Sequence, residues 1–129
     1  MLINTFLIFS LSGGAEKKSS NTGESYKLWS GEKPGNDVKV IHGKYWQSAH
    51  FTGEYTAYLE LDASSKWKNE FIKQNHLLNT VFNQDTPAGA PNWFTPQKNS
   101  RMWRQQVDAG YMYMEDSKTG HFFIYEEQL

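Results

Sequence analysis

The stretch FTGEYTAYLELD, residues 51–62, carries the clearest structural signal in the chain. Its odd positions, from Phe51 to Leu61, are apolar, aromatic or glycine, whereas the even positions, from Thr52 to Asp62, are mostly polar. Strict alternation of this kind predicts an antiparallel strand with one face on a core and the other in solvent. We therefore expect the odd face to lie in the interior and the even face to be solvated.

A change of period after this strand predicts a helix. Residues 62–65, DASS, offer side-chain oxygens that can cap a helix start. Apolar residues then recur at helical spacing while charged residues take the opposite side, which predicts an amphipathic helix that ends near Asn79 or Asn83. Residues 85–91, DTPAGAP, contain two prolines and a glycine and cannot continue it. The apolar stripe consists of Trp67, Phe71, Leu78 and Phe82.

Further strands are expected on both sides of these two elements. Residues 38–48 are rich in β-branched and aromatic side chains, and residues 101–107, 111–115 and 121–126 have the pattern of a meander. The elements then follow the order ββ-α-βββ. This predicts an α+β fold in which an antiparallel sheet of about five strands carries one amphipathic helix on one face.

The composition limits the function classes. A chain of 129 residues has room for one hydrophobic core, and an aromatic content of 16% indicates that rings form much of it. The net charge of −1 argues against nucleic-acid binding driven by bulk positive charge. Lys98, Arg101 and Arg104 near Trp103 suit contact with single-stranded nucleic acid, but a solvated strand face explains them as well. We therefore expect no nucleic-acid partner.

The N-terminal residues differ from the rest of the chain. Residues 1–15, MLINTFLIFSLSGGA, hold an apolar run of about ten residues, roughly half of what spans a bilayer, followed by small residues. This pattern is typical of an export signal, although no Lys or Arg precedes the run. An ordinary core strand or helix over residues 2–11 is the alternative interpretation.

The end of this leader, Leu11-Ser12-Gly13-Gly14, resembles the lipobox of bacterial lipoproteins, Leu-Ser-Gly-Cys, with Gly14 in place of the lipidated cysteine. The resemblance implies a protein exported to the periplasm or held at the outer membrane. It implies a lipid anchor only if position 14 were cysteine. Polar residues 16–25 are then interpreted as a tether, and residues 26–129 as a single α+β domain.

Candidate catalytic residues are sparse. His50 and Glu54 share the even face of the strand over residues 51–62, and His121 can join them if its strand is a neighbour. Such a group suits a small hydrolase or a metal-dependent enzyme, but histidine and glutamate are also ordinary residues of a solvated strand. The chain has no cysteine, no nucleophile elbow and no phosphate-binding glycine loop. We expect no catalysis, no metal and no cofactor.

Aromatic residues are the stronger candidates for recognition. Residues 91–96, PNWFTP, hold Trp93 and Phe94 between two prolines. The segment can present an anchor to a protein partner, offer a stacking platform to a sugar, or plug the end of a small core. Trp46 and Trp103 are the further candidates for binding.

These features predict a small non-catalytic binding protein of the bacterial cell envelope. We expect a protein partner, in an inhibitor, immunity-type or assembly role. One alternative is a small hydrolase or metal-dependent enzyme that uses His50 and Glu54. The other is a carbohydrate-binding module with exposed tryptophans.

Overall fold

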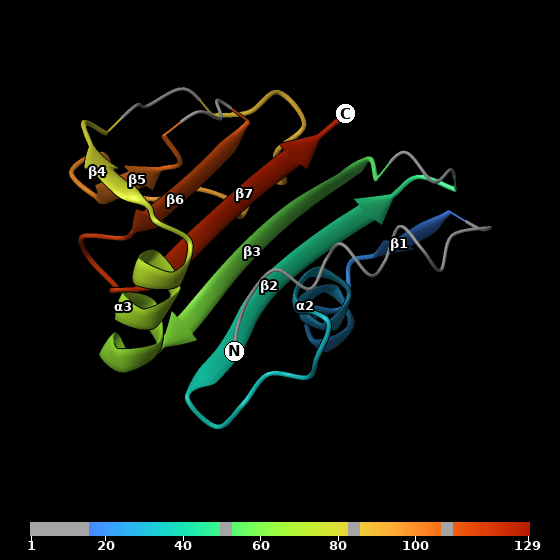
Figure 1. Ribbon diagram of the computed structural model, residues 1–129, viewed down its shortest axis with the longest axis horizontal. Coiled ribbons are helices and arrows are strands. Elements are labelled where there is room, and N and C mark those ends of the chain that lie inside the picture. The colour runs from blue at the N-terminus through green and yellow to red at the C-terminus, as the bar shows by residue number, and fades with distance from the viewer. Residues whose placement is uncertain (1–15, 50–52, 83–85, 107–109) are drawn as a thin grey trace.

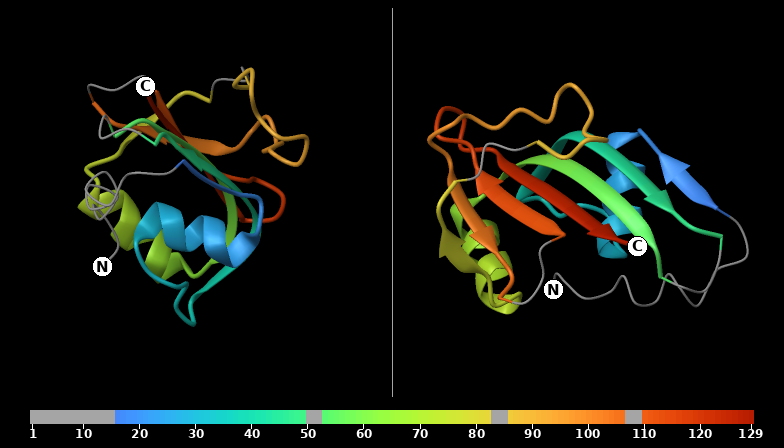
Figure 2. Two further views of the ribbon diagram at one scale, coloured as in Figure 1. Left: turned by 90° about the vertical axis from the view of Figure 1, so that its right-hand side faces the viewer. Right: turned by 90° about the horizontal axis from the view of Figure 1, so that it is seen from above.

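The computed structural model describes residues 16–49, 53–82, 86–106 and 110–129. This part of the chain forms one antiparallel sheet of seven strands, in the order β1-β2-β3-β7-β6-β5-β4, and two helices (Figure 1). Both helices lie on one face of the sheet, and residues 86–100 lie over the other face (Figure 2). The elements are β1 Lys17–Ser19, α2 Thr22–Ser30, β2 Val38–Gln47, β3 Tyr55–Ala63, α3 Ser65–Gln74, β4 Leu78–Thr80, β5 Arg101–Arg104, β6 Tyr111–Glu115 and β7 Phe122–Gln128.

This architecture corrects the fold expected from the sequence. The predicted arrangement of five strands and one helix is wrong, because the described chain is mostly sheet and has seven strands and two helices. The additional strands, β1 and β4, have three residues each, which is too short to produce a periodic pattern. The additional helix, α2, starts within the polar segment that was interpreted as a tether.

Residues 16–25 are therefore part of the fold as far as the structure describes them. Lys17–Ser19 pair with β2, and the first turns of α2 follow. The side chain of Asn21 caps this helix by accepting a hydrogen bond from the Glu24 backbone N–H at 2.9 Å. Gly31 ends the helix in the left-handed conformation, with φ of 91°. The leader, residues 1–15, lies outside the described residues.

The core beneath the helices contains the odd face of β3. The odd residues from Tyr55 to Leu61 are buried, as the alternation predicts. Helix α2 adds Tyr26 and Trp29, and it lies so close to β2 that a Cβ at Gly43 would be 2.7 Å from the Cβ of Ser25. The close approach requires glycine at this position. Helix α3 contributes two stacked rings, those of Trp67 and Phe71.

The middle of the even face of β3 is also buried, contrary to expectation. Only 4% of Tyr58 and 9% of Glu60 are exposed, because residues 86–100 lie over this face (Figure 2). Phe94 of this segment is 2% exposed, and its ring contacts those of Tyr58 and Phe123 edge-on at 5.3 and 5.4 Å. The sheet thus has a hydrophobic cluster on each face. The second cluster is completed by Met102, Met112, Met114 and Tyr125.

Helix α3 is shorter than predicted. It begins after the N-cap Ser64, as expected, but it ends at Gln74 and not near Asn79. His76 adopts a φ of 53°, in the left-handed region, so the helical backbone cannot continue through it. The next residues form β4, where Leu78 is 53% exposed instead of facing the core.

Candidate functional site

The residues predicted as a catalytic group do not come together in the described structure. His50 lies outside the described residues. Glu54 directly precedes β3, whereas His121 precedes β7 at the other end of β3, where Phe122 pairs with Leu61. An extended strand from Glu54 to Leu61 is about 23 Å long. Glu54 and His121 therefore cannot act on the same small ligand.

His121 belongs instead to a cluster with Glu60 and His42. Nδ1 of His121 lies 2.7 Å from Oε2 of Glu60, and Nδ1 of His42 lies 2.8 Å from Oε1 of the same carboxylate. The strand order β2-β3-β7 brings these side chains together. The ring of Trp93 stacks on His42, with centroids 4.8 Å apart and an interplanar angle of 17°. The cluster thus connects three strands to the segment that covers them.

This cluster has some of the features of a catalytic pair. A carboxylate that accepts from Nδ1 orients an imidazole and leaves Nε2 available for proton transfer. Here, however, Trp93 covers one face of the His42 ring. No group of three histidine, cysteine or acidic residues in the described ranges has an arrangement that could hold a metal ion. The geometry fits a structural role, in which these contacts hold residues 86–100 against the sheet.

A second hydrogen bond network fastens the same covering segment. Oδ1 of Asp116 accepts from the Gln97 backbone N–H at 2.7 Å, and Oδ2 accepts from the Thr119 backbone N–H at 2.8 Å. Burial opposes ionisation of Asp116, but these hydrogen bonds and one from the Lys118 N–H outweigh it and lower the pKa of the carboxyl. The ionised carboxylate thus ties the covering segment to the turn between β6 and β7.

A third carboxylate, Glu126, is buried on the helical face of the sheet. It accepts hydrogen bonds from the Trp29 indole at 2.9 Å and from the hydroxyls of Tyr55 and Tyr113 at 2.8 and 2.5 Å. Burial raises the pKa of Tyr55 far above its usual value, and the charge of Glu126 raises it further. Because its partners come from α2, β3 and β6, this network fixes the helix to the sheet.

The predicted binding aromatics have different environments. Phe94 and Trp103 are buried in the two hydrophobic clusters, and Trp93 is half-buried against His42. Arg101 lies over the Trp103 ring at 4.8 Å and forms an ion pair with Glu115. Three of these rings are therefore occupied by contacts within the protein. The fourth, Trp46, is partly exposed and lines a cavity.

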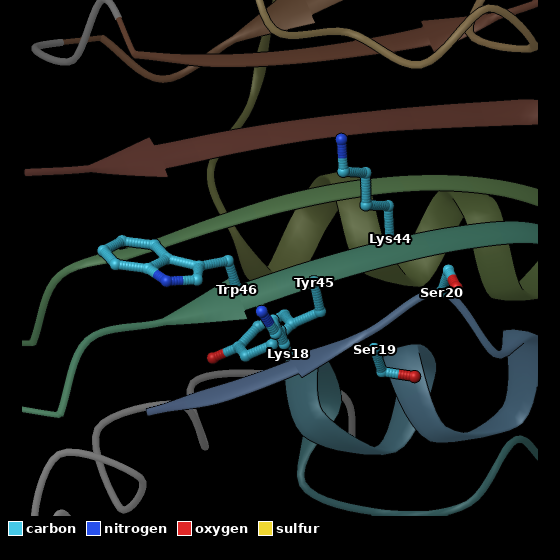
Figure 3. Close-up of a pocket in the computed structure, with 6 residues that line it drawn as sticks. All are labelled: Lys18, Ser19, Ser20, Lys44, Tyr45 and Trp46. Carbon is cyan, nitrogen blue, oxygen red and sulfur yellow. The ribbon is translucent and has the colours of Figure 1, made fainter. Parts of the chain in front are cut away.

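This cavity lies beside β1 and β2 and has a volume of about 410 Å³. Figure 3 shows its lining: Lys44, Tyr45 and Trp46 come from β2, and the others from β1 and the residue after it. No acidic group of the described residues forms an ion pair with Lys18 or Lys44, although both are exposed. The indole N–H of Trp46 donates a hydrogen bond to the carboxylate of Glu16. The full lining is Lys18, Ser19, Ser20, Lys44, Tyr45 and Trp46.

Trp46 was a candidate from the sequence, whereas the lysines around it were not. A signal for one of them was present, because Lys44 and Trp46 are two residues apart in a strand and therefore share a face. Lys18 could not be included, since it reaches the site only through the pairing of β1 with β2, which sets Lys18 opposite Trp46.

Comparisons with known proteins gave no match, whether with protein families, curated proteins or solved structures. Within the described ranges, neither helix has the length and apolar character needed to cross a membrane.

Proposed function

We propose that the protein is a small non-catalytic binding domain of the bacterial cell envelope that engages a protein partner at the cavity beside β1 and β2. The observation that carries this proposal is the cavity lining. Lys18 and Lys44 form no ion pair with a described residue. Trp46, next to the last residue of β2, is partly exposed in the same lining. The lysines and the exposed part of the Trp46 ring can contribute to an intermolecular contact, where tryptophan is enriched among energetically important residues.

Catalysis is less well supported than binding. The three buried carboxylates of the described residues are each held by hydrogen bonds that join elements of the fold: Glu60 by two histidines, Asp116 by backbone N–H groups, and Glu126 by tyrosines and a tryptophan. The cavity is lined by lysine, serine and aromatic side chains, so no carboxylate or imidazole in its lining can act as a general base.

A protein partner is favoured over a sugar because the cavity offers one partly exposed indole. Trp29, Trp67 and Trp103 are buried, and Trp93 is stacked on His42. The sugar-binding alternative requires at least two exposed rings side by side to form a platform. The resemblance of residues 11–14 to a lipobox supports export, so we place the partner in the cell envelope.

Site-specific photocrosslinking in the bacterium that encodes the protein tests this proposal. A benzophenone amino acid is placed at Lys44, beside the cavity, and in a matched variant at Lys66, an exposed lysine at the start of α3. We expect a discrete crosslinked protein species from position 44 that is absent from position 66. Equal crosslinking from both positions, or none from position 44, would refute a protein-binding role for the cavity.

A further inference from the structure

We infer that the partner presents an extended acidic segment, with carboxylates on alternate residues, to the cavity beside β1 and β2. This inference rests on the proposed function and specifies the chemistry of the partner. It follows from the charge of the cavity, from the spacing of the two lysines and from an internal carboxylate that already contacts Trp46.

The charge of the cavity selects an anionic ligand. Of its six lining residues, two are lysines and none is acidic. Neither Lys18 nor Lys44 is neutralised by an ion pair with a described residue. The hydroxyl of Ser20 can donate a further hydrogen bond to a carboxylate oxygen. A carboxylate therefore finds both charge compensation and hydrogen bond donors here.

The spacing of the lysines selects an extended ligand. Lys18 pairs with Trp46, so Lys18 and Lys44 are diagonal neighbours on adjacent strands, with Cα atoms roughly 7–8 Å apart. Side chains two residues apart on one face of an extended peptide are separated by a similar distance, about 6.6 Å. In Figure 3 the Lys44 side chain is directed from β2 toward β3, away from β1. The ammonium groups thus do not surround one point, and two separate carboxylates match them better than one.

Glu16 shows how a carboxylate is received at this site. It is an exposed residue that precedes β1, and its carboxylate accepts the hydrogen bond of the Trp46 indole. An acidic side chain of the partner can replace Glu16, because its carboxylate can accept the same hydrogen bond from the Trp46 indole and can also contact the nearby lysines. Glu16 is therefore a competitor, and its negative charge opposes the binding of an acidic partner.

The experiment measures the affinity of the whole protein for two synthetic peptides by fluorescence anisotropy at low salt. One peptide alternates glutamate with threonine, and its control replaces each glutamate with glutamine. We expect the acidic peptide to bind more tightly and its affinity to fall as salt is added. Lys18→Ala and Lys44→Ala should each weaken it about three- to fivefold, as expected for an exposed ion pair. Lys66→Ala is the matched control and should have no effect.

Glu16→Gln provides the opposite change and should strengthen binding of the acidic peptide by about two- to fivefold, because a competing charge is removed. Equal affinities for both peptides, or no response to the lysine substitutions, would overturn the acidic segment. The proposed function would then still stand if position 44 forms its crosslink. A sulfated oligosaccharide that binds in a manner dependent on Lys18 and Lys44, while neither peptide binds, would overturn the inference in favour of a sugar ligand. Failure of the crosslink as well would also remove the proposed function.

Discussion

Replacement of Phe94 with alanine tests whether residues 86–100 are an integral part of the core. Phe94 is 2% exposed, and it contacts Tyr58 and Phe123 ring to ring. An aromatic side chain of this kind buries about 150–250 Å², which corresponds to about 4–6 kcal/mol at 25 cal/mol per Å². Alanine keeps part of that area, and measured Phe→Ala costs in cores are about 3–5 kcal/mol. Because an irregular segment can partly collapse into the space, we expect a loss near 3 kcal/mol.

Urea denaturation followed by tryptophan fluorescence measures this loss. With a slope of about 1.5 kcal/mol per molar urea, the midpoint should fall by about 2 M. Thr95→Ala, at the exposed neighbouring position, is the control and should change stability by less than about 0.5 kcal/mol. A Phe94→Ala loss below about 1 kcal/mol would mean that the segment does not fill a second core, and that the even face of β3 is solvated after all.

Four further predictions follow from the polar groups and the leader. Glu60→Leu should cost about 1–3 kcal/mol in urea denaturation, because both imidazoles lose the carboxylate that they contact; an unchanged midpoint would contradict this structural role. Asp116, whose pKa is lowered in the folded state, stabilises the protein above about pH 4, and this contribution is lost as the pH falls through the folded pKa. Asp116→Asn should therefore be less stable at neutral pH and equal to the wild type in acid, which thermal melts at several pH values will show. Burial raises the pKa of Tyr26 to about 12, so its contribution to folding stability is complete below about pH 10 and is lost as the pH rises through 12. Tyrosinate absorbance should therefore rise together with the loss of near-ultraviolet circular dichroism. A rise in absorbance that precedes unfolding would contradict this. Gly14→Cys in a bacterial host should give a lipidated, membrane-associated protein by mass spectrometry and detergent partitioning, whereas an unmodified product would contradict the lipobox resemblance.

The sequence predicted the elements whose patterns are local. Alternation placed Tyr55 and Leu61 in the interior, and the residues before Trp67 correctly indicated a capped helix start. The helix end was missed because Leu78 continues the helical spacing, although its backbone pairs with β5 in a strand. Asn75 and His76 were the available stop signals.

Helix α2 was missed because its segment is polar. Its first residues carry hydroxyl, glycine and carboxylate groups, and only Tyr26, Leu28 and Trp29 indicate a buried face. The sequence does contain an N-terminal signal, since Asn21 is followed three residues later by Glu24. Composition alone suggested a tether there, but packing against Gly43 decides the outcome.

The polar clusters could not be predicted from spacing along the chain. Glu60 meets His42 and His121 only because β3 lies between β2 and β7, two strands that are far apart in the sequence. Glu126 gains the indole of Trp29 as a partner because α2, which is far away in the sequence, packs on the same face of the sheet. The cavity could also be anticipated only in part, because Lys18 lies beside Trp46 only through the pairing of β1 with β2.

Mapping of a bound peptide by NMR locates the binding surface directly. In a titration of the isotope-labelled protein with the acidic peptide, the indole N–H of Trp46 and the amides of Lys18 and Lys44 should show the largest shifts. The buried indole of Trp103 should not move. Shifts concentrated at Trp93, or along β4 at the opposite edge of the sheet, would contradict the assignment of the binding surface to the cavity beside β1 and β2.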